Sequence, residues 1–384
     1  MKVINIGIVG TGFSAKAHME AIRRIPYLRV AAVAASSMEK AQQIAEEYGI
    51  PKAYGDASEL IQDNDIMAVH NCTPNYLHYA INREVLLAGK HILSEKPLGL
   101  SSIQTKELAL LAQNSRGVSG VAFNYRHFPL IAEAKHRISK LTYGQVNLVY
   151  GGFLQDWLLH RTDYNWRLEP AYNGASRALA DIGSHWCDTV QYVLGKKIVK
   201  VFADLKTVHP TRLKPPETAG MLKGQSDPEY EEIAMRTEDY GSVLVHFEDG
   251  IQGVFTISQV SAGRKNKLFF EIAAEQGSLA WNQENPHSLW IGHRDQANVE
   301  LSSDPRLLCE SAAQLAHYPG GHQEGWPDAL KNMLIDFYSV VRDPSLKSTA
   351  AVRSFANFDD GNQIMSVIDA ILESHRTEQW VKIS

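Results

Sequence analysis

The stretch Gly7-Ile8-Val9-Gly10-Thr11-Gly12-Phe13-Ser14-Ala15 lies near the start of this 384-residue sequence. The apolar run over residues 3–9 predicts a short buried strand, and the apolar spacing over residues 15–25 predicts a helix. The turn between them has the spacing G-x-G-x-x-A. A glycine-rich turn that follows a strand and opens a helix is typical of a dinucleotide-binding loop.

The residue types in this loop suit a pyrophosphate group. Gly10 permits the tight turn, Gly12 lets backbone amides approach the anion, and Ala15 lets the helix pack closely against the strand. The helix N-terminus then meets the anion with its partial positive charge. We therefore expect a nicotinamide dinucleotide to be bound by Gly10, Thr11, Gly12 and Phe13. The alternative interpretation is an ordinary glycine-rich turn.

The segments that follow alternate between strand-like and helix-like patterns. Strand-like apolar runs lie at residues 28–35, 66–71, 91–95 and 118–124, and helix-like segments at residues 38–48, 77–88 and 102–113. Ser37 is a suitable N-cap and Gly49 a suitable terminator for the first of these helices. This alternation predicts a mostly parallel sheet with helices on both faces. We therefore expect a doubly wound α/β domain of the Rossmann type over residues 1–125.

From residue 126 onward the pattern changes. Strand-like runs bounded by turn signals lie at residues 146–153, 199–205, 240–247, 252–259, 267–274, 278–281 and 288–292. Glu248-Asp249-Gly250 predicts a hairpin turn. Helices are expected at residues 129–141, 176–194 and over most of 329–383. We expect residues 126–384 to form an α+β domain with a large open antiparallel sheet, in which residues 210–232 are a mobile loop or dimer arm.

The composition excludes several classes of protein. Hydrophobic residues make up 44% and charged residues 21%, which disfavours disorder, and a net charge of −5 gives no basic footprint for nucleic acid or a membrane surface. Apolar runs of about 18 residues, long enough to span a bilayer, are absent, as is a signal-peptide pattern. Cys72, Cys187 and Cys309 lack the spacing of a metal site. We expect a cytoplasmic enzyme without a metal ion.

The tip of the second predicted strand lacks the acidic residue that often binds the ribose of NAD. It ends in Ala35-Ser36-Ser37, and Lys40 lies one helical turn further on. An acid there would repel the 2′-phosphate of NADP, whereas hydroxyl groups and a lysine can bind it. We expect Ser36, Ser37 and Lys40 to contact the cofactor, which is NAD or NADP with a slight preference for NADP. The alternative is that the serines only cap the helix.

Further candidates follow other predicted strands, since ligands of open parallel sheets lie outside the carboxyl ends of the strands. Thr73-Pro74-Asn75, with His78 in the next helix, and Asn124 are expected to contact the cofactor, although Thr73 or Asn75 could only cap the helix. Glu95-Lys96-Pro97 ends another strand, and the proline favours extended geometry at Lys96. A lysine does acid–base work once its pKa falls, but a lone Lys-Pro pair is more often on the surface.

Asp181 and His185 lie at positions i and i+4 of a predicted helix, hence on one face. A carboxylate beside an imidazole raises the basicity of the imidazole and orients it, which suits general acid–base catalysis. The same spacing could hold a metal ion, but no further ligand lies at a convincing distance. The structural alternative is a capping aspartate with a core histidine.

Taken together, the segments Gly7 to Ala15, Glu95 to Pro97 and Asp181 to His185, in this order and at these separations, resemble the Gfo/Idh/MocA family of oxidoreductases. The family is named for glucose–fructose oxidoreductase and inositol dehydrogenase, and the resemblance covers nearly the whole chain. It implies hydride transfer between a nicotinamide cofactor and a hydroxyl group of a sugar or cyclitol.

The resemblance also implies roles for particular residues. Lys96 would contact substrate and cofactor, stabilise the developing alkoxide and move a proton, and Glu95 would lie beside the cofactor. His185 would be the general acid–base, and Asp181 would bind the substrate or orient the proton relay. Ala35 departs from the family pattern, because members that use NAD often carry an acid there.

Aromatic and polar residues supply the remaining candidates. Sugar rings have apolar faces and hydroxyl rims, which suits such a mixture. Trp166 and Arg167 resemble a family segment near the nicotinamide, and contacts with the substrate are expected from Tyr125, Arg126, Gln155, Trp157 and His322. The alternative for the segment 155–167 is a packed aromatic corner.

Two other functions remain open at this level. A cofactor-binding regulator without chemistry is disfavoured by the presence of Lys96, Asp181 and His185 together. An enzyme that cleaves glycosides through transient oxidation is not separated from a dehydrogenase by the sequence. An uncovered sheet face in the second domain favours a homodimer or homotetramer.

Overall fold

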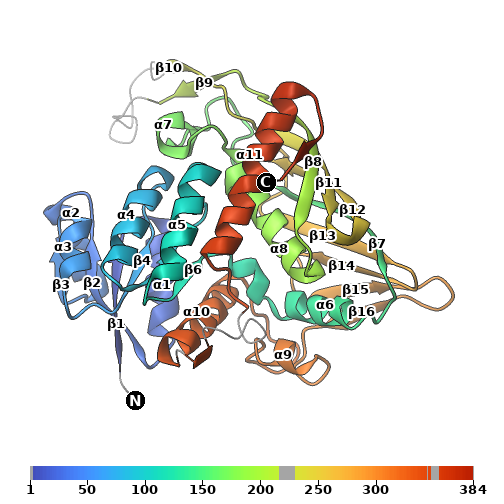
Figure 1. Cartoon of the computed structure of the whole chain (residues 1–384), viewed down its shortest axis with the longest axis horizontal. Helices are drawn as coiled ribbons and strands as arrows, with labels where there is room; N and C mark the ends of the chain where they lie inside the picture. Colours follow the sequence, from blue (N-terminus) through green and yellow to red (C-terminus); the bar gives the residue numbers. More distant parts are fainter. Residues whose placement is uncertain (1–2, 216–229, 344, 347–353, 384) are drawn as a thin grey trace, which may run out of the picture. The chain divides into compact units, whose positions relative to one another are not determined.

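A computed structural model describes residues 3–215, 230–343, 345–346 and 354–383, and they divide between two compact units (Figure 1). The first unit comprises Met1–Arg137 and Ser302–Ser366, and the second comprises Ile138–Leu301 and Val367–Ser384. Residues 302–366 therefore group with the N-terminal part of the chain, which differs from the expected division into residues 1–125 and 126–384.

The first unit contains a six-stranded parallel sheet in the order β3-β2-β1-β4-β5-β6 (Figure 1). This is the strand order of a dinucleotide-binding Rossmann fold, so the expected fold class is confirmed. The strands are β1 (Ile4–Val9), β2 (Leu28–Ala34), β3 (Lys52–Tyr54), β4 (Ala68–Asn71), β5 (His91–Ser94) and β6 (Ser119–Val121). The helices between them are α1 (Phe13–Arg23), α2 (Met38–Tyr48), α3 (Ala57–Gln62), α4 (Asn75–Leu87) and α5 (Ser102–Asn114).

Local sequence signals set the ends of these elements. Helix α2 begins after Ser37, whose side chain accepts a hydrogen bond from the Lys40 amide, and it ends at Gly49 in the left-handed conformation, as expected. The sequence pattern missed β3 and α3, which have only three and six residues and show too little periodicity to be recognised.

The part of the first unit that comes late in the sequence adds a helix to its hydrophobic core. After η1 (Asn124–His127) and α6 (Pro129–Ser139), the chain returns to this unit with α9 (Glu310–Ala313) and α10 (Trp326–Arg342). Helix α10 buries Met333, Phe337 and Tyr338 in the cluster that also contains Ile6 and Ile8 of β1. Apolar packing of α10 beside α1 is therefore the physical reason why this segment groups with the Rossmann sheet.

The second unit is built on a nine-stranded sheet in the order β16-β15-β14-β13-β7-β12-β11-β8-β17 (Figure 1). Its strands are β7 (Val146–Leu154), β8 (Ile198–Lys206), β11 (Tyr240–Phe247), β12 (Gln252–Ser258), β13 (Lys267–Ala274), β14 (Ser278–Asn282), β15 (Ser288–Gly292), β16 (Val299–Ser302) and β17 (Val381–Lys382). The expected antiparallel sheet is confirmed, but β7 and β12 pair in parallel, so the sheet is mixed.

Helices cover one face of this sheet. Helix α8 (Ser184–Leu194) inserts Trp186, whose indole stacks on Phe255 at 4.4 Å and donates a hydrogen bond to the Phe269 carbonyl oxygen. Helix α11 (Phe358–Thr377) ends beside β8, where the Ser374 hydroxyl accepts from the Ala203 amide at 3.0 Å. A buried apolar layer therefore holds the element that carries His185.

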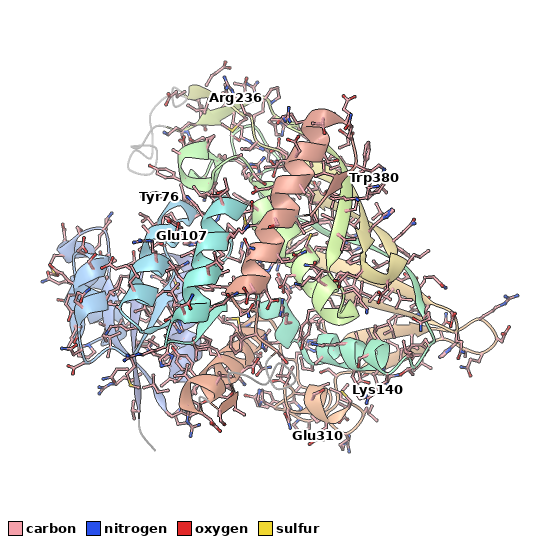
Figure 2. The ribbon with its side chains drawn as sticks, in the orientation of Figure 1. Tyr76, Glu107, Lys140, Arg236, Glu310 and Trp380 are labelled. Atoms are coloured by element: carbon pink, nitrogen blue, oxygen red, sulfur yellow. The ribbon has the colours of Figure 1, made fainter. Side chains whose placement is uncertain are left out.

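The other face carries exposed apolar side chains. Tyr150 of β7, Val254 of β12 and Leu244 of β11 form one cross-strand row and are 40%, 38% and 45% exposed. Trp380, labelled in Figure 2, packs against Phe202 and His246 at one end of this face. The row of Tyr150, Val254 and Leu244, called the open-face row below, is thus left uncovered in a single chain.

The segment 210–232 contains more order than expected. Strands β9 (Thr211–Lys214) and β10 (Glu231–Ala234) form an antiparallel ribbon at its two ends, while residues 216–229 lie outside the described residues.

The hairpin turn at Glu248–Gly250 is confirmed, with Asp249 in the left-handed conformation. Within the described part of the chain, no helix is long and apolar enough to cross a membrane.

Candidate functional site

The glycine-rich loop has the backbone geometry that a dinucleotide site requires. Gly10 has φ +109°, and a Cβ atom there would lie 2.5 Å from the Cys72 carbonyl oxygen. A side chain is thus excluded at Gly10 by the neighbouring β4 loop. At Gly12, by contrast, a Cβ atom would meet none of the described atoms within 4 Å. The backbone of Gly12 therefore borders open space, as the approach of a pyrophosphate to this loop would require.

Helix α1 begins directly after this open position. Gly12 is its N-cap, and no side chain of the described residues caps the helix. Ala15 is fully buried, which permits the close packing of helix and strand. Because β1 and β4 are neighbours whose connections run to opposite sides of the sheet, the loop lies at the topological switch point. The residues present fit a nicotinamide dinucleotide.

The tip of β2 carries the candidates for the ribose site. Ser37 caps α2 by accepting from the Lys40 amide at 3.3 Å, so the structural alternative holds for this serine. Ser36 and Lys40 are exposed, and Lys40 Nζ lies 3.4 Å from Ser36 Oγ. A cation and a hydroxyl group therefore lie together at the place where a ribose substituent is expected.

The loop after β4 is fixed by buried polar groups. Thr73 Oγ1 donates to Asn71 Oδ1 at 2.7 Å. The two ring nitrogens of His78 lie 2.6 Å from the Pro97 carbonyl oxygen and 2.9 Å from the Thr73 carbonyl oxygen. His78 is thus buried and connects the loop after β4 with the loop after β5, which suits an indirect role in shaping the cofactor site.

A buried chain of side chains lies behind the Glu95-Lys96-Pro97 turn, and sequence reasoning missed it. His18 Nδ1 lies 2.8 Å from His70 Nδ1, and His18 Nε2 lies 3.3 Å from Glu95 Oε1. His70 Nε2 lies 2.8 Å from the Tyr338 hydroxyl. The available signal was a histidine at position 18, on the face of α1 that also buries Ala15, Met19 and Ile22.

The pKa shifts within this buried row of side chains indicate that the imidazole of His18 is charged and that of His70 is neutral. Burial lowers the pKa of His18, but Cys72 and Glu95 raise it by more, to about 10. Burial raises the pKa of Glu95, but His18 and Lys96 lower it by more, to about 2. Burial and the charge of His18 hold the pKa of His70 well below its ordinary value. His18 therefore donates from both ring nitrogens, to neutral His70 and to ionised Glu95.

Lys96 is partly buried directly beyond this pair. Its backbone amide donates to Glu95 Oε2 at 3.1 Å, and its peptide bond to Pro97 is cis. Asn124, which follows β6 in the same unit, is 2% exposed, and its Nδ2 atom has no hydrogen-bond partner among the described residues. A buried unpaired donor at the carboxyl end of a strand is consistent with a ligand contact.

In the second unit, Asp181 and His185 lie on consecutive helical segments. Asp181 belongs to a π-helical turn, η3 (Leu179–Gly183), and His185 lies in the first turn of α8, where it is 8% exposed. Gln259 Nε2 donates to Asp181 Oδ2 at 2.9 Å, a partner that sequence reasoning missed. The signal was a polar residue directly after β12, two positions beyond Ile257 and thus in line with the buried Phe255 and Ile257 on the inward face.

The aromatic stretch of the second unit is held by local contacts. Trp157 Nε1 donates to Gln155 Oε1 at 2.9 Å, and Gln155 Nε2 donates to Asn266 Oδ1 at 3.0 Å. In η2 (Trp166–Leu168), the guanidinium of Arg167 lies 4.6 Å from the centre of the Trp166 ring. These four candidates are all partly buried.

Three further substrate candidates lie in the first unit. Tyr125 is 2% exposed and stacks on Phe128, and Arg126 is 8% exposed and pairs with Asp360 at 3.4 Å. His322 is exposed in a loop. The structure thus gives Tyr125 and Arg126 packing roles of their own. Within the described residues there is no cluster of three or more side chains suited to a metal ion.

Comparison with known protein families gives a matching family model for each of two consecutive segments of the chain. Residues 4–123 match the family model described as the oxidoreductase family, NAD-binding Rossmann fold, of Gfo/Idh/MocA proteins, and residues 131–280 match the model of the Gfo/Idh/MocA C-terminal domain. Levoglucosan dehydrogenase from Pseudarthrobacter phenanthrenivorans is 29% identical to this chain, and the alignment covers 100% of the chain and 99% of the relative.

Solved structures agree over the same length. A levoglucosan dehydrogenase in complex with NADH and L-sorbose has a TM-score of 0.88 at 27% identity, with 100% of both chains covered. An inositol dehydrogenase homologue from Azotobacter vinelandii, complexed with NAD+, has a TM-score of 0.87 at 22% identity, and it covers 99% of this chain and 97% of its own. The second similarity concerns the fold alone.

Proposed function

Since the chain belongs to the Gfo/Idh/MocA family of oxidoreductases, we propose that it transfers hydride between a nicotinamide cofactor and a hydroxyl-bearing carbon of a sugar, cyclitol or glycoside. The observation that carries this proposal is its similarity to levoglucosan dehydrogenase over the whole chain. The open backbone at Gly12 and the buried donor of Asn124 support it on the cofactor side.

The proposed chemistry assigns a step to each catalytic residue. Oxidation of the substrate removes a hydride from carbon and a proton from the hydroxyl group. The bound nicotinamide supplies the hydride acceptor. His185 takes the hydroxyl proton, Asp181 binds the substrate or orients the proton relay, and Lys96 stabilises the developing alkoxide with its positive charge.

A neutral sugar is the substrate class that we propose. The names of the relatives mention levoglucosan, an anhydrosugar, and L-sorbose. Partly buried aromatic and amide groups at Trp157, Trp166 and Gln155 suit a ring with apolar faces and a hydroxyl rim. A net charge of −5 is compatible with this class, because a neutral sugar needs no electrostatic steering.

We further propose that NADP is used at least as well as NAD. Support comes from Ser36 and Lys40, which lie together at the tip of β2, where no acid is present to repel a 2′-phosphate. The test is kcat/KM for the two cofactors with one sugar. A preference for NAD of more than about tenfold, equivalent to about 1.4 kcal/mol, would overturn this part of the proposal.

A turnover panel tests the main proposal. The purified protein is incubated with NAD or NADP and with levoglucosan, L-sorbose, glucose and inositol, and reduced nicotinamide is followed at the same time as the sugar products. Net reduction supports a dehydrogenase. Cleaved product without net reduction supports transient oxidation, and cofactor binding without any product supports a regulator.

Replacement of the proposed catalytic residues gives a sharper outcome. Lys96→Met and His185→Ala are each expected to lower kcat by about 10²–10⁴, the usual contribution of a positioned acid or base. Cofactor affinity should stay within severalfold, because neither change alters the glycine-rich loop. Near-normal kcat in His185→Ala at every pH would show that the role assigned to His185 is wrong.

A further inference from the structure

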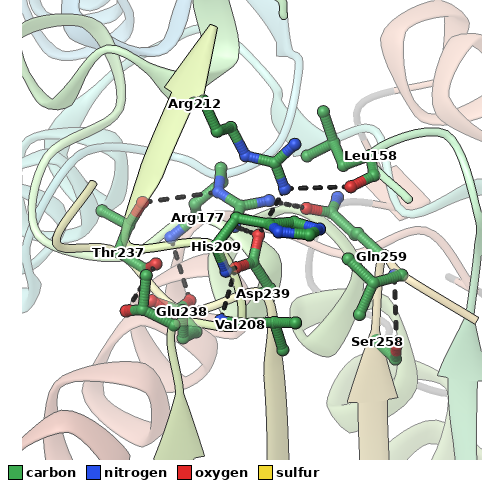
Figure 3. Close-up of polar contacts among 12 residues, drawn as sticks. Leu158, Arg177, Val208, His209, Arg212, Thr237, Glu238, Asp239, Ser258 and Gln259 are labelled. Carbon is green, nitrogen blue, oxygen red and sulfur yellow. Dashed lines mark hydrogen bonds and ion pairs between the residues drawn. The ribbon is translucent and has the colours of Figure 1, made fainter. Parts of the chain in front are cut away.

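A buried cluster of charged side chains surrounds Asp239 in the second unit (Figure 3). Oδ1 of Asp239 accepts from Arg177 and from Arg212 Nη2, and all three side chains are at most 2% exposed. Oδ2 accepts from the amides of Val208 and His209 at 2.7 and 3.0 Å. Burial raises the pKa of the Asp239 carboxyl, but the two arginines and these bonds hold it below its ordinary value. The aspartate is therefore ionised and firmly held.

Arg177 connects this cluster with the proposed catalytic carboxylate. Its Nη1 atom donates to Gln259 Oε1 at 2.5 Å, and Gln259 Nε2 donates to Asp181 Oδ2 at 2.9 Å. A guanidinium group carries only donors, so Arg177 selects the amide orientation in which Oε1 of Gln259 faces the arginine. Nε2 of Gln259 must then face Asp181. Oδ2 of Asp181 therefore meets a hydrogen-bond donor and not a second acceptor.

Arg212 connects the same cluster with the aromatic stretch. Its guanidinium donates to the carbonyl oxygen of Leu158 at 2.9 Å (Figure 3). It also donates to the carbonyl oxygens of His160 at 2.9 Å and Asp163 at 3.2 Å. In the sequence, the residues that carry these carbonyl groups lie between Trp157 and Trp166, two of the candidates for substrate contact. One buried network thus holds both Asp181 and the backbone of this stretch.

The backbone before Asp181 is held by a neighbouring acid. Glu238 Oε1 accepts from Ser176 Oγ at 2.8 Å and from the amides of Arg177 and Leu179 at 2.9 Å each. The Asp181 amide in turn donates to the Arg177 carbonyl oxygen at 2.8 Å. The position of the Asp181 main chain is therefore set by the same short segment, residues 237–239 directly before β11, that carries Asp239.

We propose that Gln259, oriented by Arg177, is a positioning residue for Asp181. It holds one carboxylate oxygen in place, and the Arg177–Asp239–Arg212 cluster keeps the amide from turning. This inference rests on the proposed dehydrogenase function, because it assigns Asp181 to the reaction. A catalytic group gains most of its effect when its geometry is fixed before the reaction. A purely structural cluster would affect stability without affecting the reaction.

Gln259→Met is the first test, because methionine has a similar volume but lacks both hydrogen-bonding groups. With a sugar that the wild type turns over, we expect kcat to fall by about 10- to 100-fold, the effect of a lost hydrogen bond to a charged group. KM for the cofactor should stay within about twofold, because the cofactor loop lies in the other unit. This split between kcat and KM distinguishes positioning from general damage.

Two other variants complete the design. Gln259→Glu keeps an acceptor for Arg177 but places a second carboxylate against Asp181, so we expect kcat to fall further than in Gln259→Met. It also keeps the inference testable if Gln259→Met fails to fold. Ser374→Ala is the matched control, since it removes buried hydrogen bonds with Ala203 and Gln379 elsewhere in the same unit. It should lower the melting temperature and leave kcat unchanged.

The outcomes separate the inference from the proposed function. Wild-type turnover together with normal kcat in both Gln259 variants would overturn the positioning role and leave the dehydrogenase proposal intact. A fall in kcat that Ser374→Ala reproduces would show a structural effect only, which also overturns the role. Absence of wild-type turnover on the whole panel would overturn the proposed function, and the inference with it.

Discussion

Two glycines of the same loop are required for different reasons. Gly10 is constrained by the protein itself, through its φ of +109° and the Cys72 carbonyl oxygen 2.5 Å from an added Cβ atom. Gly12 has open space where its Cβ atom would be, so the folded chain alone does not require glycine there. A requirement for glycine at position 12 therefore points to a ligand.

This difference predicts opposite results for two substitutions. Gly12→Val is expected to leave the melting temperature of the cofactor-free protein nearly unchanged and to abolish binding of NAD and NADP, because its side chain occupies the pyrophosphate position. Gly10→Ala is expected to lower the melting temperature, since the alanine clashes with the β4 loop and is strained at positive φ. Thermal unfolding and cofactor titration of both variants measure these effects. Normal cofactor binding by Gly12→Val would contradict the assigned loop.

Sequence motifs single out candidate residues but not the partners of those residues. Gly10, Lys96 and Asp181 were recognisable because each stands in a short motif with a chemical reason for its residue type. The partners Gln259 and Arg177 were not, because a glutamine 78 residues from Asp181 has no local signal of its target. The pairing of Arg126 with Asp360 likewise has no local signal in the sequence, since 234 positions separate the two residues.

At the scale of elements, the pair of His18 and Glu95 connects α1 with the turn after β5. His18, whose pKa is raised by Cys72 as well as by Glu95, contributes stability that is fully present below its ordinary pKa of 6.5 and is lost as the pH rises through about 10. Glu95 contributes stability that is present above its ordinary pKa of 4.5 and is lost as the pH falls through about 2. The pair therefore stabilises the protein most between pH 4.5 and pH 6.5.

We accordingly expect His18→Gln to destabilise the protein most in that window. Breaking a buried ion pair costs about 3–5 kcal/mol, so the melting temperature should fall clearly at pH 5.5 and by less at pH 9.5. Thermal unfolding of wild type and variant at both pH values tests this. Lys16→Gln is the control, because Lys16 lies on α1 like His18 but forms only an exposed ion pair, with Glu47 of α2, and its loss should change little. An equal effect of His18→Gln at both pH values would contradict the charged pair.

Periodicity in the sequence predicts the order of the long helices and strands, but it does not reveal the short ones. The main strands and helices of the parallel sheet appear as expected because each buries a continuous apolar run or stripe. Strands β9 and β10 were missed because their side chains are mostly exposed or half-buried, so they form a ribbon with each other without a local apolar pattern.

At the scale of the whole molecule, the open-face row is an apolar surface that a single chain leaves uncovered. We propose that it packs against a second copy in a homodimer or homotetramer. Leu244→Lys is expected to weaken this assembly, because it buries an unpaired charge. Light scattering after gel filtration should show a shift from oligomer to monomer.

A matched substitution controls for general effects of an added lysine. Leu87 is 61% exposed on α4 in the first unit, so Leu87→Lys should leave the oligomeric state unchanged. A monomeric wild type, or an unchanged oligomer in Leu244→Lys, would show that the open-face row is not the interface.

The sequence by itself determined the Rossmann sheet, the glycine loop and the family, because these depend on periodicity and on short motifs within which all the necessary residues are adjacent. Only the tertiary structure decided that α10 completes the core of the first unit and that Arg177 and Gln259 hold Asp181. The physical reason is that burial and hydrogen-bond direction depend on atoms far apart in the chain. His70 and Tyr338, whose contact spans 268 positions, are one example.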